Sequence, residues 1–354
     1  MRGVGPRVAS RLVEQFGDPI RVLAAGRAEL EAVGLKPALV DAVLDPPQAA
    51  ADADLAWAEG EGVRILTRDD PRYPPLLAQL SAPPILLFVR GDPEVLKDPM
   101  LAVVGSRNPT PSGRETTGDF ARYLATCGLT IVSGLAIGID GAAHAGALEG
   151  GRTVAVLGTG PDRVYPAAHR DLARRIAENG ALVTEYPPGT VPVGRNFPRR
   201  NRMISGLSLG TLVTEAALKS GSLITARYAV EQGREVFAIP GSIHNPLARG
   251  CHALIRDGAK LVESAADILE ELGPLLGPLA AETTEPARSG ADDPEAPDAD
   301  YRRLLENLGH DPVSPDDLIR RTGLPAQAIA SMLLLLELKG HVSSCPGGRY
   351  CRST

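Results

Sequence analysis

The sequence is poor in the features that mark secreted, membrane-spanning and metal-binding proteins. Its 354 residues include four cysteines, none in a Cys-x-x-Cys pair, and so sparse a set suits a reducing compartment better than a disulfide framework. No apolar run approaches the ~18 residues that span a bilayer, and residues 1–17 are too polar for a signal peptide. The sequence therefore predicts a cytoplasmic protein without a membrane partner.

Aromatic residues and excess positive charge are also scarce. Phe, Trp and Tyr make up 4% of the chain, and 37 Lys and Arg against 43 Asp and Glu give a net charge of −6. Averaged over the chain, this argues against a nucleic-acid partner, because non-specific binding to polyanions needs basic surface. However, residues 280–300 alone hold seven acids and one base, so their charge of −6 equals that of the whole chain. The objection therefore applies to an average and not to any one surface.

Five segments follow one another along the chain. Residues 1–45 show two glycine turns ahead of helical patterns, as in SAM or helix-hairpin-helix modules, although an ordinary small helical bundle fits the same pattern. Residues 46–98 are a Pro-rich connector leading into a sheet, with a strand predicted over 85–89. Residues 280–300 lack bulky apolar side chains and are predicted to be an acidic disordered linker. Residues 301–354 combine three helical patterns with a hairpin signal, which is typical of a winged helix.

The remaining segment, 99–279, alternates short β-branched runs with helical patterns. One helix between successive strands indicates βαβ units, and therefore an α/β fold with a doubly wound, mostly parallel sheet. The runs are apolar throughout, as expected when helices cover both faces of a sheet. Strands are predicted over residues 101–104, 130–132, 153–157, 182–184, 211–213, 236–239 and 260–262. Helices are predicted over residues 113–127, 140–149 and 222–232.

Glycine-rich loops follow several of these strands. The carboxyl ends of parallel strands share one rim of the sheet, where ligands bind. Backbone amides, hydroxyls and cations on such a rim suit phosphate oxygens. The candidate contacts are Ser106, Arg107, Ser133, Gly134, Gly138, Lys219, Ser220 and Gly221. None of the loops has the Gly-x-Gly-x-x-Gly spacing of a dinucleotide site or the Gly-Lys-Ser/Thr of a P-loop, so no nucleotide cofactor is expected.

The segment VGRNFPRRNRMIS at 193–205 concentrates positive charge within an acid-free stretch, 186–214. Its four arginines are Arg195, Arg199, Arg200 and Arg202. Phe197 lies among them next to a proline, in a stretch that we expect to be irregular. Arginines on phosphates, with an aromatic platform for a base, are typical of proteins that bind single strands without reading their sequence. The alternative is a solvated basic loop with Phe197 docked in the core.

Catalytic and metal-binding patterns are weak. Asp140 and His144 are spaced to share one face of a helix, but such a pair is more often structural than catalytic. His169, His244 and His252 have no metal-ligand spacing with a cysteine or an acid. No Gly-x-Ser-x-Gly nucleophile motif is present. We therefore expect no catalytic residue, no metal site and no cofactor.

Together these motifs resemble the DNA-processing protein A (DprA/Smf) family over most of residues 70–272. The most specific match is FPRRNR at 197–202 followed by KSGSLITA at 219–226, and SGLAIGIDGAAHAGAL at 133–148 agrees with it. The resemblance implies an extended Rossmann domain that binds single-stranded DNA and forms a homodimer. It also implies loading of the RecA recombinase and protection of incoming DNA during natural transformation, with no enzymatic activity.

The resemblance also assigns roles to individual positions. It implies that Arg107 and the Ser133–Gly134 loop hold phosphates, and that Lys219 and Ser220 close the pocket. The strand path implied by the resemblance runs along Phe197, Arg200, Asn201 and Arg202. Ile137 departs from the family pattern, which usually has arginine there, so one cation of the phosphate loop is missing.

Two other functions fit parts of the sequence. The stretch GLSLGTLVTEA at 206–216 is similar to the PGGxGTxxE motif of phosphoribohydrolase-like enzymes, but it lacks the double glycine and has one more residue between Thr and Glu. A duplex-DNA-binding regulator that uses the winged helix is the second alternative. A helix that reads the major groove needs Arg, Asn or Gln at its N-terminal face, but in this third helix only Gln327 qualifies and the single basic residue, Lys339, lies at the other end. That favours a protein-interaction or regulatory role for the winged helix.

Overall fold

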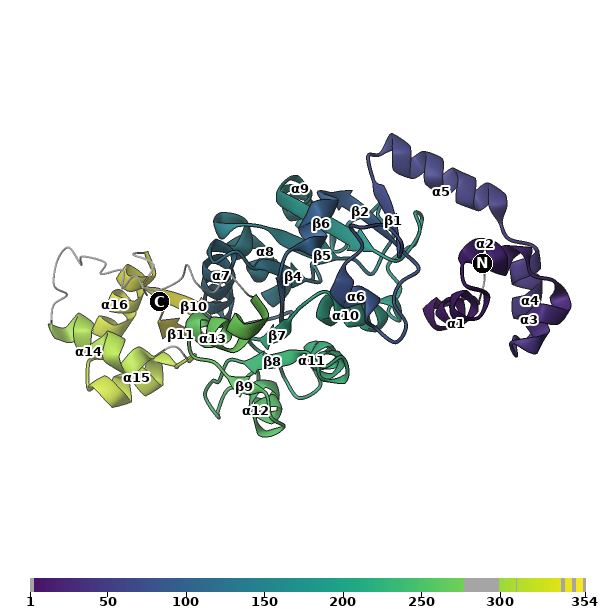
Figure 1. Ribbon diagram of the computed structural model, residues 1–354. Helices are drawn as coiled ribbons and strands as arrows, with labels where there is room; N and C mark the ends of the chain where they lie inside the picture. The colour runs from purple at the N-terminus through teal and green to yellow at the C-terminus, as the bar shows by residue number, and fades with distance from the viewer. Residues whose placement is uncertain (1–2, 277–298, 310, 339–340, 346–347, 353–354) are drawn as a thin grey trace.

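The computed structural model describes residues 3–276, 299–309, 311–338, 341–345 and 348–352. Figure 1 shows helices of the N-terminal segment at one side, a sheet covered by helices in the centre, and a small C-terminal unit at the other side. The linker predicted over residues 280–300 lies outside the described residues, except for its last two. Within the described part of the chain, no helix is both long and apolar enough to cross a membrane.

A single large sheet forms the centre of the molecule. Its strands are β1 (Arg64–Thr67), β2 (Leu86–Gly91), β3 (Met100–Val104), β4 (Thr130–Ser133), β5 (Thr153–Val156), β6 (Gly180–Thr184), β7 (Gly210–Val213), β8 (Glu235–Ala238) and β9 (Lys260–Leu261). Their order in space is β1-β2-β6-β5-β4-β3-β7-β8-β9. Strands β3 to β9 pair in parallel, whereas β1 and β2 are antiparallel additions beyond β6. The predicted doubly wound, mostly parallel sheet is confirmed, and each strand predicted over 99–279 is present.

The sheet begins earlier in the chain than the sequence indicates. β1 and β2 both belong to the segment 46–98, which the sequence describes as a connector leading into the sheet. The strand expected over 85–89 corresponds to β2, but β1 is not expected. β1 is a four-residue edge strand with a single fully buried side chain, Leu66, so it has neither the length nor the alternation of a recognisable strand.

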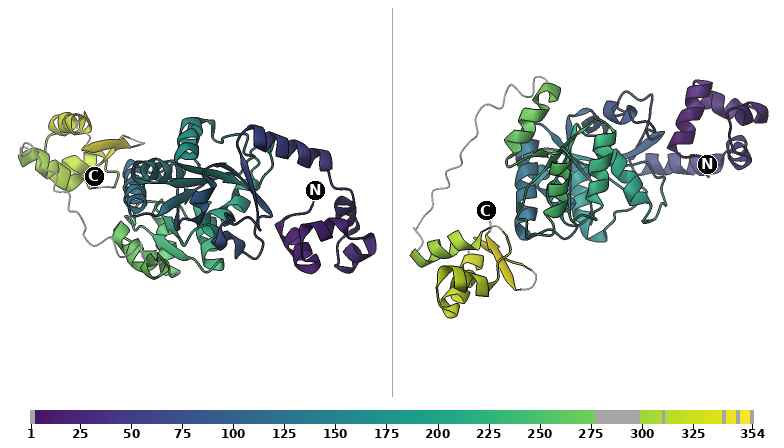
Figure 2. Two further views of the ribbon diagram at one scale, coloured as in Figure 1. Left: turned by 45° about the horizontal axis from the view of Figure 1, so that its top comes forward. Right: turned by 90° about the horizontal axis from the view of Figure 1, so that it is seen from below.

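Helices cover both faces of this sheet (Figure 2). In β3, Met100, Ala102 and Val104 belong to the core on one face, and Leu101 and Val103 belong to the core on the other. Both sets are buried because alternate side chains of a strand point to opposite faces. Each large apolar side chain buried in this way contributes about 1.5–3 kcal/mol. The apolar strands of the sequence therefore reflect a sheet that water does not reach.

The helices divide between the two faces as the cores indicate. The first face carries α6 (Pro75–Ala78), α10 (Asn196–Gly206), α11 (Ser222–Glu231) and α12 (Arg249–Arg256). The second face carries α7 (Pro111–Thr126), α8 (Ile139–Gly150), α9 (Arg170–Asn179) and α13 (Ala265–Leu276). Two short 3-10 turns, η1 (Pro93–Lys97) and η2 (Ala167–His169), lie in the connections. The predicted helices over 113–127, 140–149 and 222–232 are α7, α8 and α11.

Two smaller units flank the sheet. The N-terminal unit contains α1 (Pro6–Phe16), α2 (Pro19–Ala24), α3 (Arg27–Ala32) and α4 (Pro37–Leu44), and α5 (Gln48–Gly60) leads from it to β1. Leu12, Leu30 and Val40 are buried at its centre. The C-terminal unit contains α14 (Ala299–Leu308), α15 (Pro315–Thr322), α16 (Ala326–Leu338), β10 (Val342–Cys345) and β11 (Arg349–Arg352). Three helices followed by an antiparallel hairpin give the predicted winged-helix arrangement.

Candidate nucleic-acid interface

A crevice opens where the connections of the sheet change direction. From β3 the chain continues to β4 on one side, whereas β7 pairs with β3 on the other side. In open α/β sheets, ligands bind outside the carboxyl ends of the strands at this point. A cavity of about 650 Å³ lies there. The predicted site residues that line it are Ser106, Arg107, Phe197, Arg200, Asn201, Lys219, Ser220 and Gly221.

Arg200 lies at the buried side of this cavity. It projects from α10, its exposed fraction is 4%, and its Nε and Nη1 atoms have no hydrogen-bond partner. Burial lowers the pKa of Arg200 to about 10, against the opposing effect of Asp140, so the guanidinium remains charged at pH 7. A buried donor without an acceptor costs about 1–3 kcal/mol, and more when it is charged. The cavity is therefore lined by a buried cation whose Nε and Nη1 atoms are unpaired among the described residues.

The loop after β4 is shaped to admit this guanidinium. A Cβ on Gly134 would lie 1.5 Å from Nη1 of Arg200, so only glycine leaves space for the arginine. Asp140 fixes the loop, since its Oδ2 accepts hydrogen bonds from the amides of Gly134 at 3.1 Å and Ala136 at 3.2 Å. Gly138 has a φ of 85° and lies so close to Ser106 that a Cβ would be 2.4 Å from its carbonyl oxygen. Gly134 and Gly138 thus act through backbone packing.

Ser133 differs from the expectation that it touches phosphate. Its hydroxyl is fully buried and donates to the carbonyl oxygen of Val103 at 2.6 Å, which ties β4 to β3. The hydroxyls that do border the cavity belong to Ser106, Ser220 and Ser222. Ser220 and Ser222 lie 2.7 Å apart at the amino end of α11. These hydroxyls are placed where a phosphate oxygen can accept from them.

Phe197 lies in a helix, so the irregular stretch expected around it is wrong. α10 begins at Asn196, and Pro198 falls in its first turn, where the missing amide has no helical partner to lose. The Phe197 ring lies against Gly158 and 5.6 Å, between centroids, from the ring of Tyr165. Tyr165 is 51% exposed and is an aromatic neighbour of Phe197 that the sequence does not reveal. Of the two rings, Phe197 lines the cavity and Tyr165 does not.

The four arginines of the segment 193–205 have different environments. Arg200 lines the crevice, as described. Arg202 is held by the side chain of Glu185 at 2.5 Å and by the carbonyl oxygen of Ala82 at 2.6 Å, and it does not line the crevice. Arg199 lines a second cavity instead, and Arg195 is an exposed residue at the start of α10. Of the strand path implied over Phe197, Arg200, Asn201 and Arg202, the first three therefore line the crevice and Arg202 does not.

The exposed cations of the crevice have no counter-ion in the part of the chain that the structure describes. Arg107 follows β3 and Lys219 precedes α11, and neither forms an ion pair or hydrogen bond within the described residues. Asn201 donates to the carbonyl oxygen of Gly221 at 3.3 Å, which fixes the loop that carries Lys219. Ile137, which replaces the usual arginine, is 43% exposed and does not line the cavity. Arg107, Arg200 and Lys219 thus give the crevice its positive charge.

Glu215, the acid that a phosphoribohydrolase-like enzyme would use, has a structural role. Its carboxylate lies at the amino end of α7 and accepts from the amide and the hydroxyl of Thr110, each at 2.8 Å. Gly113 packs directly against this carboxylate, and Asn245 donates to it at 3.5 Å. A carboxylate at a helix amino end satisfies free amides and offsets the helix dipole. Glu215 therefore stabilises α7 and leaves no free carboxylate at the crevice.

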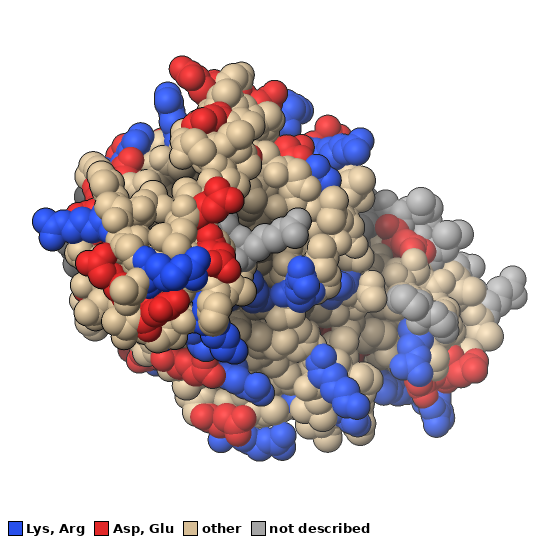
Figure 3. Space-filling model, turned by 90° about the vertical axis from the view of Figure 1, so that its right-hand side faces the viewer, with Lys and Arg blue, Asp and Glu red and all other residues tan. Residues whose placement is uncertain are grey.

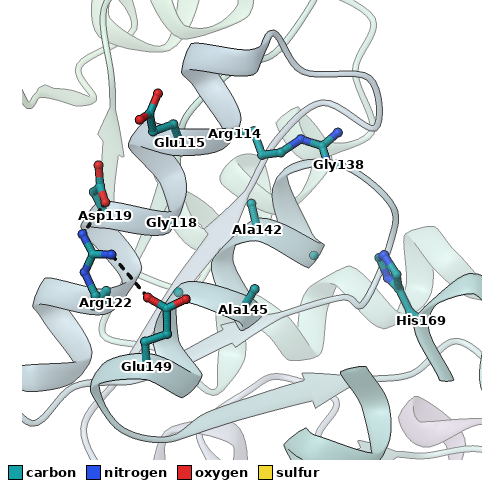
Figure 4. Close-up of a pocket in the computed structure, with 12 residues that line it drawn as sticks. Arg114, Glu115, Gly118, Asp119, Arg122, Gly138, Ala142, Ala145, Glu149 and His169 are labelled. Atoms are coloured by element: carbon teal, nitrogen blue, oxygen red, sulfur yellow. Dashed lines mark hydrogen bonds and ion pairs between the residues drawn. The ribbon is translucent and has the colours of Figure 1, made fainter. Parts of the chain in front are cut away.

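A further hollow, between α7 and α8, does not suit a polyanion (Figure 4). It measures about 520 Å³ and contains Glu115, Asp119 and Glu149 beside Arg114 and Arg122. Arg122 is neutralised by ion pairs with Asp119 and Glu149. Among the described residues there is no cluster of His, Cys, Asp and Glu that could hold a metal ion.

His144 is enclosed and is not a candidate base. It is fully buried, and its Nδ1 lies 2.7 Å from Oγ1 of Thr153. Burial lowers the pKa of His144 to about 3, with a smaller effect in the same direction from His169 and Arg200. The ring is therefore neutral across the physiological range. Its spacing from Asp140 reflects their shared helix, α8, and no contact between the two.

Comparison with known proteins identifies relatives of this chain. The family described as DNA recombination-mediator protein A matches residues 64–273, and the DprA winged helix domain matches residues 286–348. The Smf protein of Escherichia coli is 44% identical, with 90% of this chain and 85% of that protein covered. The DNA processing protein DprA of Streptococcus pneumoniae is 49% identical, with 57% of this chain and 72% of that protein covered.

Two solved structures extend the comparison. The X-ray structure of DprA from Streptococcus pneumoniae superposes with a TM-score of 0.63 at 38% identity, covering 76% of this chain and 98% of that chain. DNA processing protein A from Helicobacter pylori, reported for its single-stranded DNA binding mode, has a TM-score of 0.55 at 30% identity, covering 60% of this chain and 96% of that one. Matches of this extent show that the chain belongs to the DNA recombination-mediator protein A (DprA/Smf) family.

Proposed function

We propose that the crevice at the ends of β3 and β7 binds single-stranded DNA without sequence specificity. The observation that carries the proposal is Arg200, a buried cation with two unpaired nitrogens at a cavity that Arg107 and Lys219 also border. The oxygens of a phosphodiester group can accept the hydrogen bonds that this guanidinium does not make within the described residues. Since these contacts go to the backbone of a strand, they carry no sequence information.

The aromatic surface favours a single strand over a duplex. The Phe197 ring lines the cavity with the Tyr165 ring beside it, and unpaired bases stack on such rings whatever their identity. Bases in a duplex are already stacked on one another and are not available to these rings. The Helicobacter pylori relative, reported for its single-stranded DNA binding mode, supports the same ligand here.

We propose the wider role on the basis of the family. The protein would act as a recombination mediator that protects incoming DNA during natural transformation and loads RecA onto it. It would work in the cytoplasm as a homodimer formed through the sheet domain, and without catalysing a reaction. The engagement of Glu215 at the amino end of α7 supports the non-enzymatic reading, because the acid needed by a phosphoribohydrolase is not free.

The test is a comparison of single-stranded and duplex DNA by fluorescence anisotropy. We expect oligo-dT to bind more tightly than a duplex of equal length. The double variant Arg107→Ala with Lys219→Ala should weaken oligo-dT binding and reduce the slope of log K against log salt by about 0.7 per lost phosphate contact. The matched control is Arg174→Ala on α9, outside the crevice. Equal binding of single strand and duplex, or an unchanged double variant, contradicts the proposal.

A further inference from the structure

A second cavity lies between the N-terminal helices and the sheet domain. It measures about 820 Å³ and is bordered by the amino end of α1 on one side and by α10 and α11 on the other. The residues that matter for its charge are Arg7, Arg199, Arg202, Glu231 and Arg234. Figure 3 views the molecule from the side of the N-terminal helices and shows Lys and Arg side chains gathered around a hollow in this face.

Helix α10 supplies arginines to both cavities. Phe197, Arg200 and Asn201 line the crevice, whereas Arg199 and Arg202 line the second cavity. This division follows from the helix itself, because residues three or four apart share a face and adjacent residues do not. The motif FPRRNR therefore extends positive charge from one cavity to the other across the width of one helix.

Three cations of the second cavity form no ion pair among the described residues. Arg7 and Arg199 form no ion pair or hydrogen bond within the described residues. Arg234 donates to the carbonyl oxygen of Leu76 at 3.2 Å and to the side chain of Gln79 at 3.1 Å, but its buried Nε has no acceptor. Three guanidinium groups from separate elements thus converge on one space without a carboxylate partner.

The other charged residues of the second cavity do not neutralise Arg7, Arg199 and Arg234. Arg202 is paired with Glu185 and contributes no free charge. Glu231 is the acid that borders the cavity, and it forms no ion pair among the described residues. Three free cations against one acid leave a net positive charge in a concave space. Like charges held together in this way repel one another unless an anion lies between them.

We propose that this second cavity binds backbone phosphates of the same DNA strand that occupies the crevice. A strand leaving the crevice at Arg200 passes over α10 and meets Arg199, then Arg7 on the facing helix. The inference rests on the proposed function, because it concerns a second length of the same ligand. It assigns the N-terminal helices a role in gripping the strand, with a guanidinium from α1 opposed to one from α10.

The N-terminal side of the cavity matches this ligand. Gly5 precedes α1 and lies against Arg199, whose Nη2 would be 4.0 Å from a Cβ on Gly5. No side chain caps the amino end of α1, so its first amides are also directed to this side. These amides add to the three arginines and do not by themselves define the site.

The experiment compares Arg7→Glu with Arg11→Glu in the full-length protein. Both residues are exposed on α1 and carry the same charge, but only Arg7 lines the cavity. Binding of oligo-dT of about 6 and about 20 nucleotides, lengths that bracket known single-strand site sizes, is measured by anisotropy at several salt concentrations. We expect Arg7→Glu to weaken binding of the long oligonucleotide about tenfold and to lower its salt slope by about 1. Binding of the short oligonucleotide should not change.

The outcomes separate this inference from the proposed function. If Arg7→Glu and Arg11→Glu have the same effect, or if Arg7→Glu weakens both lengths equally, the second site is rejected while the crevice remains. If inorganic phosphate at constant ionic strength removes the difference between the two lengths, the cavity holds a free anion and not the strand. If neither oligonucleotide binds the unaltered protein, the proposed function itself fails.

Discussion

At the scale of single residues, the central feature is a buried arginine that depends on a glycine. Arg200 occupies space that a side chain at position 134 would fill. The sequence identifies Arg200 and Gly134 as candidates but not their contact, because that contact depends on which way α10 faces. Tyr165 is missed for the same reason, since it meets Phe197 only through a loop that follows β5. Residue types are readable from the sequence, whereas their pairing requires the fold.

Replacement of Gly134 by alanine tests this contact. The added Cβ would lie 1.5 Å from Nη1 of Arg200, so the guanidinium must leave its position. We expect Gly134→Ala to weaken oligo-dT binding at least tenfold in an anisotropy titration, because one charge-assisted phosphate contact is lost. The control is Gly60→Ala on α5, outside the crevice, where a Cβ meets nothing within 4 Å. Equal affinities of the two variants would contradict the role given to Gly134.

His144 provides a prediction about pH and stability. Its pKa is lowered to about 3 by burial, whereas a histidine in the unfolded chain has a pKa near 6.5. The unfolded state therefore takes up a proton below pH 6.5 that the folded state does not, and stability falls as the pH falls. Between pH 7 and pH 5 this amounts to about 2 kcal/mol. His144→Asn should reduce the acid-induced loss by about that amount in urea unfolding. An unchanged loss would show that His144 is not buried as described.

At the scale of elements, the sheet is largely predictable and the helices are less so. The strands from β3 to β7 are buried along their whole length, which gives a continuous signal in the sequence. The sequence does not predict α10, because Pro198 and the arginines of this segment are typical of a loop. In the structure the helix begins at Asn196. Arg200 lines the crevice and Arg199 lines the second cavity because adjacent residues of a helix point in different directions. The sequence identifies all four as candidate DNA contacts but does not separate their environments.

Helix α7 carries a prediction of its own. Glu215 accepts two hydrogen bonds at the amino end of this helix, so Glu215→Gln removes a charge that offsets the helix dipole. The expected loss of stability in urea unfolding is about 1 kcal/mol, with DNA binding retained. Glu235→Gln, at an exposed position at the start of β8, should change neither property. Loss of DNA binding without loss of stability in Glu215→Gln would point to a direct role of this acid at the crevice.

At the scale of the whole molecule, charge is distributed unevenly. The net charge of −6 is matched by residues 280–300, so it does not describe the surface around the crevice. There Arg107 and Lys219 form no ion pair among the described residues, Arg200 adds a buried cation, and Arg7 and Arg199 extend the same field to the N-terminal helices. A protein that is acidic overall can therefore bind a polyanion through one local field. The order of the three parts along the chain is readable from the sequence, but the cavity between the first two is not.

The most direct test of the central claim is a crystal structure of the protein with oligo-dT bound. The account predicts a phosphate of the strand between Arg107, Arg200 and Lys219, with an oxygen about 2.7–2.9 Å from Nε or Nη1 of Arg200. A base stacked on Phe197 is expected beside it. A strand bound elsewhere, with those two nitrogens still unpaired, would contradict the account.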